Sequence, residues 1–256
     1  MPTLTCFHSS CSEVIKDKNR ELRDALRLRG EVDSKHQDKT EKFRKQEARR
    51  KEATRQRASS CLARVLNDHK WPYGAIIADG DVEAPPQDHW RLLLGCFDPA
   101  DVVWIGEVRD SGQPHHAKNF RTTAQWLEES AAPAQLTCPS VFKPGICARS
   151  NDNVVQRRFL VVESDVLKRD EVGAVFRWLE RAVKLPLVAV VDTAGKSLHG
   201  WFQFPPPNRL EELKVVLPAL KCDPKLFTAS QPVRLPGALR DGKHQKLVYL
   251  RKEVAR

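Results

Sequence analysis

Residues 13–58 constrain the fold most, because almost nothing in this segment could enter a hydrophobic core. It contains no proline and a single glycine, Gly30, and it is dense in lysine, arginine and glutamate. Such residues favour helix, and pairs such as Glu47 and Lys51 have the i,i+4 spacing that stabilises one. We predict one or two exposed helices here, interrupted near residues 30–34.

The compact part of the chain must therefore come from the residues after this segment. We expect a basic, helical N-terminal arm over residues 1–66 and a folded domain over residues 67–256. The whole chain of 256 residues carries a formal charge of +10, and the arm supplies much of it. A basic surplus favours polyanionic partners such as nucleic acid. The arm is either a solvated charged helix without a binding task or a contact for nucleic acid or a partner protein.

Several protein classes are excluded by composition. No apolar run approaches the roughly 20 residues that span a bilayer, and the N-terminus lacks the apolar core of a signal peptide. Seven scattered cysteines indicate reduced thiols in a cytoplasmic protein rather than a disulfide framework. Cys6, His8 and Cys11 lie close together, but no second ligand pair follows, so we expect no structural zinc.

The second half of the chain alternates strand and helix signals in the order β-α-β-β-α-β. The predicted strands cover residues 158–162, 187–191, 201–204 and 247–250, and the helices residues 170–182 and 208–220. This order is typical of the ferredoxin-like, RRM-like or split βαβ sheet of the α+β class.

Further elements are expected before this pattern. The apolar run over residues 102–106 predicts a strand, and a turn should follow at residues 110–113. A helix is expected over residues 120–129, with Thr122 or Thr123 as its cap.

Two carboxylates, Glu163 and Asp165, follow the strand at residues 158–162. Residues i and i+2 of a strand point to one face, so these two anions would repel each other there, and burial would raise the pKa of both. A divalent cation relieves both penalties, and carboxylate oxygens suit Mg²⁺ or Mn²⁺. Asp223, just after the second helix, could be a third acid of this site or an ordinary turn residue.

The link between the second and third strands combines a lysine, a hydroxyl and an imidazole. Gly195 permits a tight turn, and Lys196 follows it; Ser197 and His199 then alternate onto one face of the emerging strand. This set could bind an anion, although the spacing of a P-loop is absent. No nucleophile elbow accompanies Ser197, so a serine hydrolase is not indicated.

Three arginines could bind phosphate. Arg234 and Arg240 flank a rigid Pro-Gly turn, and Arg149 precedes the acidic strand. Guanidinium forks match phosphate oxygens, although a surface salt bridge is the alternative for each. Carboxylates that could bind a metal ion, together with cationic side chains that could bind phosphate, indicate phosphoryl-transfer chemistry.

Taken together, these motifs resemble the archaeo-eukaryotic primase superfamily, most of all the PrimPol-type primases of bacteria, phages and plasmids. The resemblance rests on the acidic strand ending at Glu163 and Asp165, the Ser197-Leu198-His199 motif and the segment 234–240. It covers residues 90–250 and leaves the arm outside. The first motif opens with Glu163, where aspartate is commoner in the family. Glutamate keeps the negative charge, but its side chain is longer by one methylene.

The resemblance implies a template-dependent nucleotidyltransferase, a DNA primase or primase-polymerase, whose catalytic core occupies residues 67–256. Two Mg²⁺ or Mn²⁺ ions would be its cofactors. Its metal ligands would be three acids: Glu163, Asp165 and Asp223. These acids and His199 would be the catalytic residues. Groups contacting nucleotide phosphates or template would be basic or polar: Lys196, Ser197, His199, Arg149, Arg234 and Arg240.

The same resemblance implies the partners. They would be a single-stranded DNA template, NTPs or dNTPs, and a replicative helicase on a separate chain, since no helicase P-loop is present; no membrane partner is expected. Two alternatives stay open. One is a non-catalytic nucleic-acid-binding module of the same fold that acts in replication initiation, and the other is a metal-dependent nuclease.

Overall fold

The structure is a computed structural model that describes residues 12–80, 82, 87–107 and 117–251. Its chain divides into two units, residues 1–53 and residues 54–256. The boundary expected at residue 66 therefore lies inside the second unit, to which the last turns of the first helix belong. Cys6, His8 and Cys11, and the turn expected at residues 110–113, lie outside the described residues.

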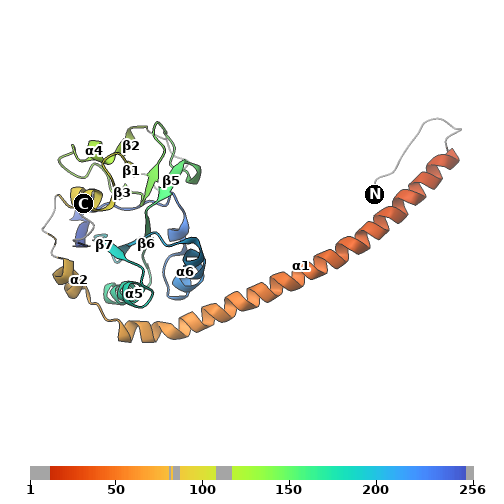
Figure 1. The fold of residues 1–256 in the computed structure, drawn as a ribbon, viewed down its shortest axis with the longest axis horizontal. Helices are drawn as coiled ribbons and strands as arrows, with labels where there is room; N and C mark the ends of the chain where they lie inside the picture. The colour runs from red at the N-terminus through yellow and green to blue at the C-terminus, as the bar shows by residue number, and fades with distance from the viewer. Residues whose placement is uncertain (1–11, 81, 83–86, 108–116, 252–256) are drawn as a thin grey trace. The chain divides into compact units, whose positions relative to one another are not determined.

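Helix α1 (Ser12–Asp68) is one continuous helix, drawn red to orange in Figure 1. The helical arm is thus confirmed, whereas the interruption expected near residues 30–34 is wrong. A single glycine costs a helix roughly 1 kcal/mol relative to alanine, and the strong helix formers around Gly30 offset that cost. Among the described helices, none combines the length and the apolar character that crossing a membrane requires.

The centre of the second unit is a four-stranded antiparallel sheet with the order β12-β7-β8-β6. Its strands are β6 (Phe159–Val162), β7 (Leu187–Asp192), β8 (Leu198–Gln203) and β12 (Lys246–Leu250). Helix α5 (Arg169–Arg181) connects β6 to β7, and α6 (Pro207–Ala219) follows β8. The α+β class with antiparallel sheets and the predicted element order are confirmed.

The position of the last strand differs from the expectation. Strands β6 and β7 are parallel with β8 between them, as a split βαβ unit requires. In the ferredoxin-like arrangement the last strand lies beside the first, but β12 pairs with β7 instead of β6. Strand order depends on contacts between distant segments, so the local pattern of residues 247–250 could not predict it.

The two faces of this sheet bury different layers. Leu160 and Val162 of β6 join the core beneath α5, α6 and α2 (Tyr73–Gly80). Phe159 and Val161, which point the other way, join a core shared with α3 (Asp88–Cys96) and the second sheet. Figure 1 shows α5 and the second sheet on opposite sides of β6 and β7.

The second sheet has the order β5-β4-β1-β3-β9, with β2 also paired to β1. Its strands are β1 (Val102–Gly106), β2 (Phe120–Thr122), β3 (Leu136–Thr137), β4 (Ser140–Phe142), β5 (Val154–Arg157) and β9 (Val233–Arg234). The predicted strand at residues 102–106 is confirmed as β1. Strands β10 (Leu239–Arg240) and β11 (Lys243–His244) form a separate hairpin.

The helix expected over residues 120–129 is shorter than predicted. Residues 120–122 pair with β1 as β2, and α4 covers only Thr123–Trp126. Thr122 caps α4 as expected, because its hydroxyl accepts a hydrogen bond from the Gln125 N–H. Single 3-10 turns complete the unit, at Ala117–Asn119 (η2), Asn151–Asn153 (η3) and Pro224–Phe227 (η4).

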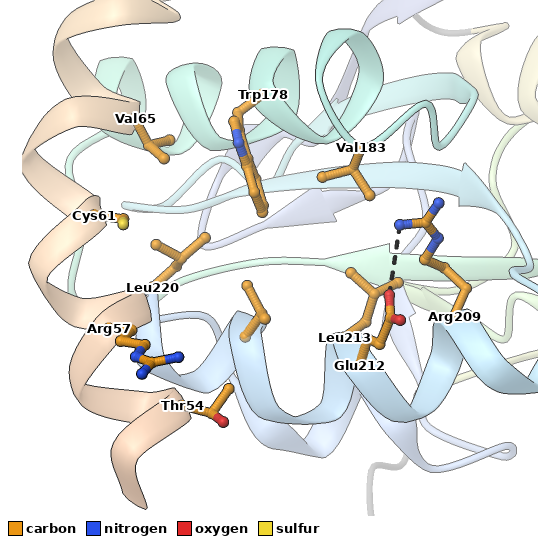
Figure 2. A pocket seen from close by; sticks show the side chains of 11 residues that line it. Thr54, Arg57, Cys61, Val65, Trp178, Val183, Arg209, Glu212, Leu213 and Leu220 are labelled. Atoms are coloured by element: carbon orange, nitrogen blue, oxygen red, sulfur yellow. Dashed lines mark hydrogen bonds and ion pairs between the residues drawn. The ribbon is translucent and has the colours of Figure 1, made fainter. Parts of the chain in front are cut away.

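The end of α1 packs on the helical layer of the second unit, where Val65 is buried. Beside it, α1, α5 and α6 leave a hollow of about 430 Å³ with mainly apolar walls (Figure 2). Trp178 of α5 and Leu213 of α6 face this hollow, and Cys61 lies on the α1 side.

Candidate active site

A second cavity, of about 570 Å³, collects most of the residues that the sequence singled out. Eight of them line it, and they come from segments up to 77 positions apart: Glu163, Asp165, Lys196, Ser197, His199, Asp223, Arg234 and Arg240. The fold therefore brings the acidic, the Ser-x-His and the arginine motifs to one place.

The alternation of the central strands explains where these side chains point. Val161 faces the second sheet, and Glu163, two residues later, lies on the same face. On β8, Trp201 also faces the second sheet, and His199 precedes it by two residues. The cavity therefore lies between the two sheets, and Arg234 of β9 reaches it from the second one.

His199 and Glu163 are in direct contact. Nε2 of the imidazole lies 2.7 Å from Oε2 of the carboxylate, and the backbone N–H of Arg234 donates to Nδ1 at 3.4 Å. Because Nδ1 is the acceptor, the proton of a neutral imidazole is on Nε2 and is donated to Glu163. The His199 side chain is only 4% exposed and therefore well fixed, so its contact orients the Glu163 carboxylate.

Hydrogen bonds to backbone carbonyls link the segments that carry these residues. The Ser197 hydroxyl donates to the Ser164 carbonyl at 3.0 Å, which joins the second motif to the first. The N–H of Asp223 donates to the Glu163 carbonyl at 3.0 Å, and the Ser164 hydroxyl donates to the Lys221 carbonyl. Ser197 and the segment Lys221–Asp223 are thus held against Glu163 and Ser164.

Asp223 has a structural contact as well as a place at the cavity. It caps η4, because its Oδ1 accepts a hydrogen bond from the Lys225 N–H at 2.9 Å. The turn role weighed for this residue is therefore present, and the side chain also lines the cavity beside Glu163 and Asp165.

The acids suit a divalent cation in one particular way. Within the described part of the chain, no three His, Cys, Asp or Glu side chains are arranged to hold a metal ion. However, Mg²⁺ is often held by only one or two carboxylates, and substrate phosphates and water complete its shell. Glu163 and Asp165, with Asp223 at the same cavity and cations opposite, fit an ion that arrives with a phosphate ligand.

Cationic groups make the rest of the cavity attractive to phosphate. Arg234 is 8% exposed, and its Nη1 donates to Oε1 of Gln135 at 3.0 Å. Arg240 donates to the Thr193 carbonyl at 3.5 Å, and Lys196 is exposed at the rim. Fixed guanidinium groups in a recess are pre-organised for phosphate oxygens.

Arg149 is not among the cavity-lining residues. Its side chain is 6% exposed, donates to the Ser230 carbonyl at 2.6 Å and stacks over the Trp104 ring at 4.7 Å. The structure thus places it in the packing of the second sheet, and it supports the segment that leads to Gln231.

Four further residues line the cavity and were not predicted as site residues: Thr193, Gly195, Lys225 and Gln231. Thr193 and Gly195 belong to the loop that the sequence had already marked. Lys225 lies in η4 and Gln231 in an irregular segment, and neither belongs to a motif, so only the tertiary fold shows their position.

Comparison with known proteins adds no relative: no protein family, no curated protein and no solved structure matches this chain.

Proposed function

We propose that this protein is a template-dependent nucleotidyltransferase, a primase or primase-polymerase that makes or extends primers during DNA replication. The observation that supports this most is the convergence of three separated motifs on one cavity. Three carboxylates lie there with two arginines and two lysines, which is the composition expected around a metal-bound nucleoside triphosphate. The proposal includes a primase-like core in residues 67–256, in which β6, β8 and β7 form the RRM-like split βαβ unit while β12 lies beside β7 instead of β6.

In the proposed reaction, a 3′-hydroxyl gives up its proton to solvent water and attacks the α-phosphorus of a bound nucleotide. An O3′–P bond forms, the bond to pyrophosphate breaks, and pyrophosphate leaves with its negative charge. Lys196, Arg234 and Arg240 bind the phosphate oxygens and stabilise the charge that develops on them. Arg234 and Arg240 already donate hydrogen bonds to Gln135 and to the Thr193 carbonyl, so these two side chains need little rearrangement on binding.

Glu163, Asp165 and Asp223 would hold Mg²⁺ or Mn²⁺, which when bound would lower the pKa of the 3′-hydroxyl and stabilise the leaving group. His199 donates to Glu163 and keeps its carboxylate directed into the cavity. Ser197 lies next to Lys196 and can offer its hydroxyl to a phosphate in exchange for the Ser164 carbonyl. Single-stranded DNA would be the template and NTPs or dNTPs the substrates.

Primer synthesis tests the proposal. The full chain is incubated with single-stranded DNA, with or without a primer, with Mg²⁺ or Mn²⁺ and labelled NTPs or dNTPs. We expect labelled product, and we expect Asp165→Asn to lower its rate at least about 100-fold, because the change removes a charge but keeps the shape. Asp152→Asn makes the same change at an exposed residue outside the cavity and should leave the rate unaltered.

Two results would contradict the proposal. Full activity of the Asp165→Asn protein would show that the acids are not needed. Absence of product under every condition, with single-stranded DNA still bound, would favour the non-catalytic binding module. Metal-dependent cutting of the DNA without synthesis would favour the nuclease.

A further inference from the structure

Loop 193–197, which carries Lys196 and Ser197, rests on a buried carboxylate. Asp192 ends β7, is 6% exposed, and binds partners from two other elements. The Tyr73 hydroxyl donates to its Oδ2 at 2.5 Å, and Nη2 of Arg169 donates to its Oδ1 at 3.0 Å. These three residues are not among those that line the cavity, so they lie behind the loop rather than beside a ligand.

Arg169 binds the loop as well as the carboxylate. The same Nη2 donates to the Gly195 carbonyl at 2.8 Å, and the guanidinium carbon lies 4.8 Å from the centre of the Tyr73 ring. A single side chain thus joins the end of β7, the middle of the loop and α2. The planar guanidinium group makes this possible, whereas an ammonium group offers no such fork.

The loop has a backbone conformation that needs support. Ala194 has a φ of 59°, in the left-handed region that is unfavourable for residues with a Cβ. Its N–H donates to Oδ1 of Asp192 at 3.0 Å, the oxygen that Arg169 also binds. Strained positions of this kind persist where the surrounding structure fixes them, and they concentrate at functional sites.

A second arginine holds the loop from the cavity side. Arg240 donates to the Thr193 carbonyl, and a Cβ added at Gly195 would lie 2.9 Å from its Nη1. Glycine at position 195 therefore lets Arg240 approach the loop closely. The loop is held between Arg169 behind it and Arg240 in front.

From these contacts we infer that Tyr73, Arg169 and Asp192 are positioning residues, which fix loop 193–197 so that Lys196 and Ser197 face the cavity. The inference rests on the proposed function in one respect: the ligand that benefits is the phosphate group of a nucleotide. The three residues do not touch that ligand. Their effect is to reduce the ordering that nucleotide binding would otherwise require.

The variant Arg169→Lys tests this inference, because it keeps the positive charge but removes the guanidinium group that donates to both Asp192 and the Gly195 carbonyl. We expect the KM for the nucleotide to rise about tenfold, since two hydrogen bonds to the loop and its anchor are weakened, with kcat within about twofold. Tyr73→Phe, which removes one hydrogen bond and keeps the ring, should change KM in the same direction by less. Arg181→Lys makes the same change at an exposed position of α5 and serves as the matched control.

Amide hydrogen exchange gives a readout that does not depend on catalysis. In Arg169→Lys, the amides of residues 194–198 should exchange at least about tenfold faster than in the wild type, while those of α5 keep their rates. Unchanged exchange and unchanged KM in this variant would overturn the inference. If the wild type incorporates no nucleotide, the proposed function fails, and the exchange comparison still decides whether Arg169 positions the loop.

Discussion

Nε2 of His199 lies 2.7 Å from Oε2 of Glu163, so the histidine of the second motif directs the acid of the first. The contact joins β8 to the end of β6 on the face that looks toward the second sheet. Neither side chain would be held in this way without the other. Changes to either residue, or to the contacts around the pair, should therefore have measurable effects.

Replacing His199 by alanine should impair catalysis more than folding. Glu163 would lose its donor, and we expect the rate of nucleotide incorporation to fall roughly 10- to 100-fold, as when partners of metal-binding acids are removed. Steady-state primer extension measures the rate, and thermal unfolding checks the fold. A normal rate in a folded protein would show that the contact has no catalytic part.

Glu163→Asp tests the length of this acid. Aspartate is one methylene shorter, so the carboxylate could not keep the 2.7 Å contact with Nε2 unless the backbone moved. We expect about tenfold lower activity although the charge is unchanged. Activity equal to that of the wild type would mean that the site tolerates the shorter acid.

The hydrogen bond between Tyr73 and Asp192 should make stability depend on pH above 10. Burial, and then the Asp192 carboxylate, raise the pKa of Tyr73 from 10.0 to about 12 in the folded protein. Its contribution is therefore complete below pH 10 and is lost as the pH rises through 12. At pH 8, Tyr73→Phe should reduce the free energy of unfolding by about 1–2 kcal/mol, and this difference should shrink between pH 10 and 12.

Urea unfolding at pH 8 and at pH 11 measures that difference. A Tyr249→Phe protein keeps Tyr73 as its single tyrosine, so absorbance at alkaline pH then follows Tyr73 alone. Ionisation close to pH 10 would contradict the assignment.

Arg149→Ala should destabilise the protein without weakening nucleotide binding. The change removes a buried hydrogen bond to the Ser230 carbonyl and the stacking on Trp104, so we expect a loss of roughly 2–4 kcal/mol in stability. The KM of the folded protein should stay within about twofold of the wild type. A rise in KM at unchanged stability would return Arg149 to the phosphate-binding group.

Local sequence signals predicted the parts of this fold that local forces determine. The strand predicted from the apolar run of residues 159–162 and the cap at Thr122 are both present, because side-chain burial and capping act within a few residues. Gly30 misled the prediction, since the surrounding helix formers outweigh one weak residue. The place of β12 beside β7 also escaped prediction, because strand order depends on packing across the whole unit.

The candidate site shows the same division. Glu163 and His199 could be found because each belongs to a short motif at a strand end, where alternation indicates direction. Gln231 carries no such signal, and its position follows from Ser230, which is hydrogen-bonded to Asn151 and Arg149 far away in the chain. Arg149 shows the reverse case, in which the right residue type occurs near the right motif but is used for packing.

The buried side chain of Gln245 has a consequence for the order in which contacts around the cavity can form during synthesis of the chain. Its amide donates to the carbonyls of Gln135 and Leu235, and its backbone pairs with Gly237 and Ala238 just before β12 begins. A ribosome adds Gln245 and β12 after it has added every acid and cation that lines the cavity. The nascent chain thus holds every acid and cation that lines the cavity before Gln245 can make these hydrogen bonds, so the contacts that join Gln135 and Leu235 to the start of β12 form only after Gln245 has been synthesised.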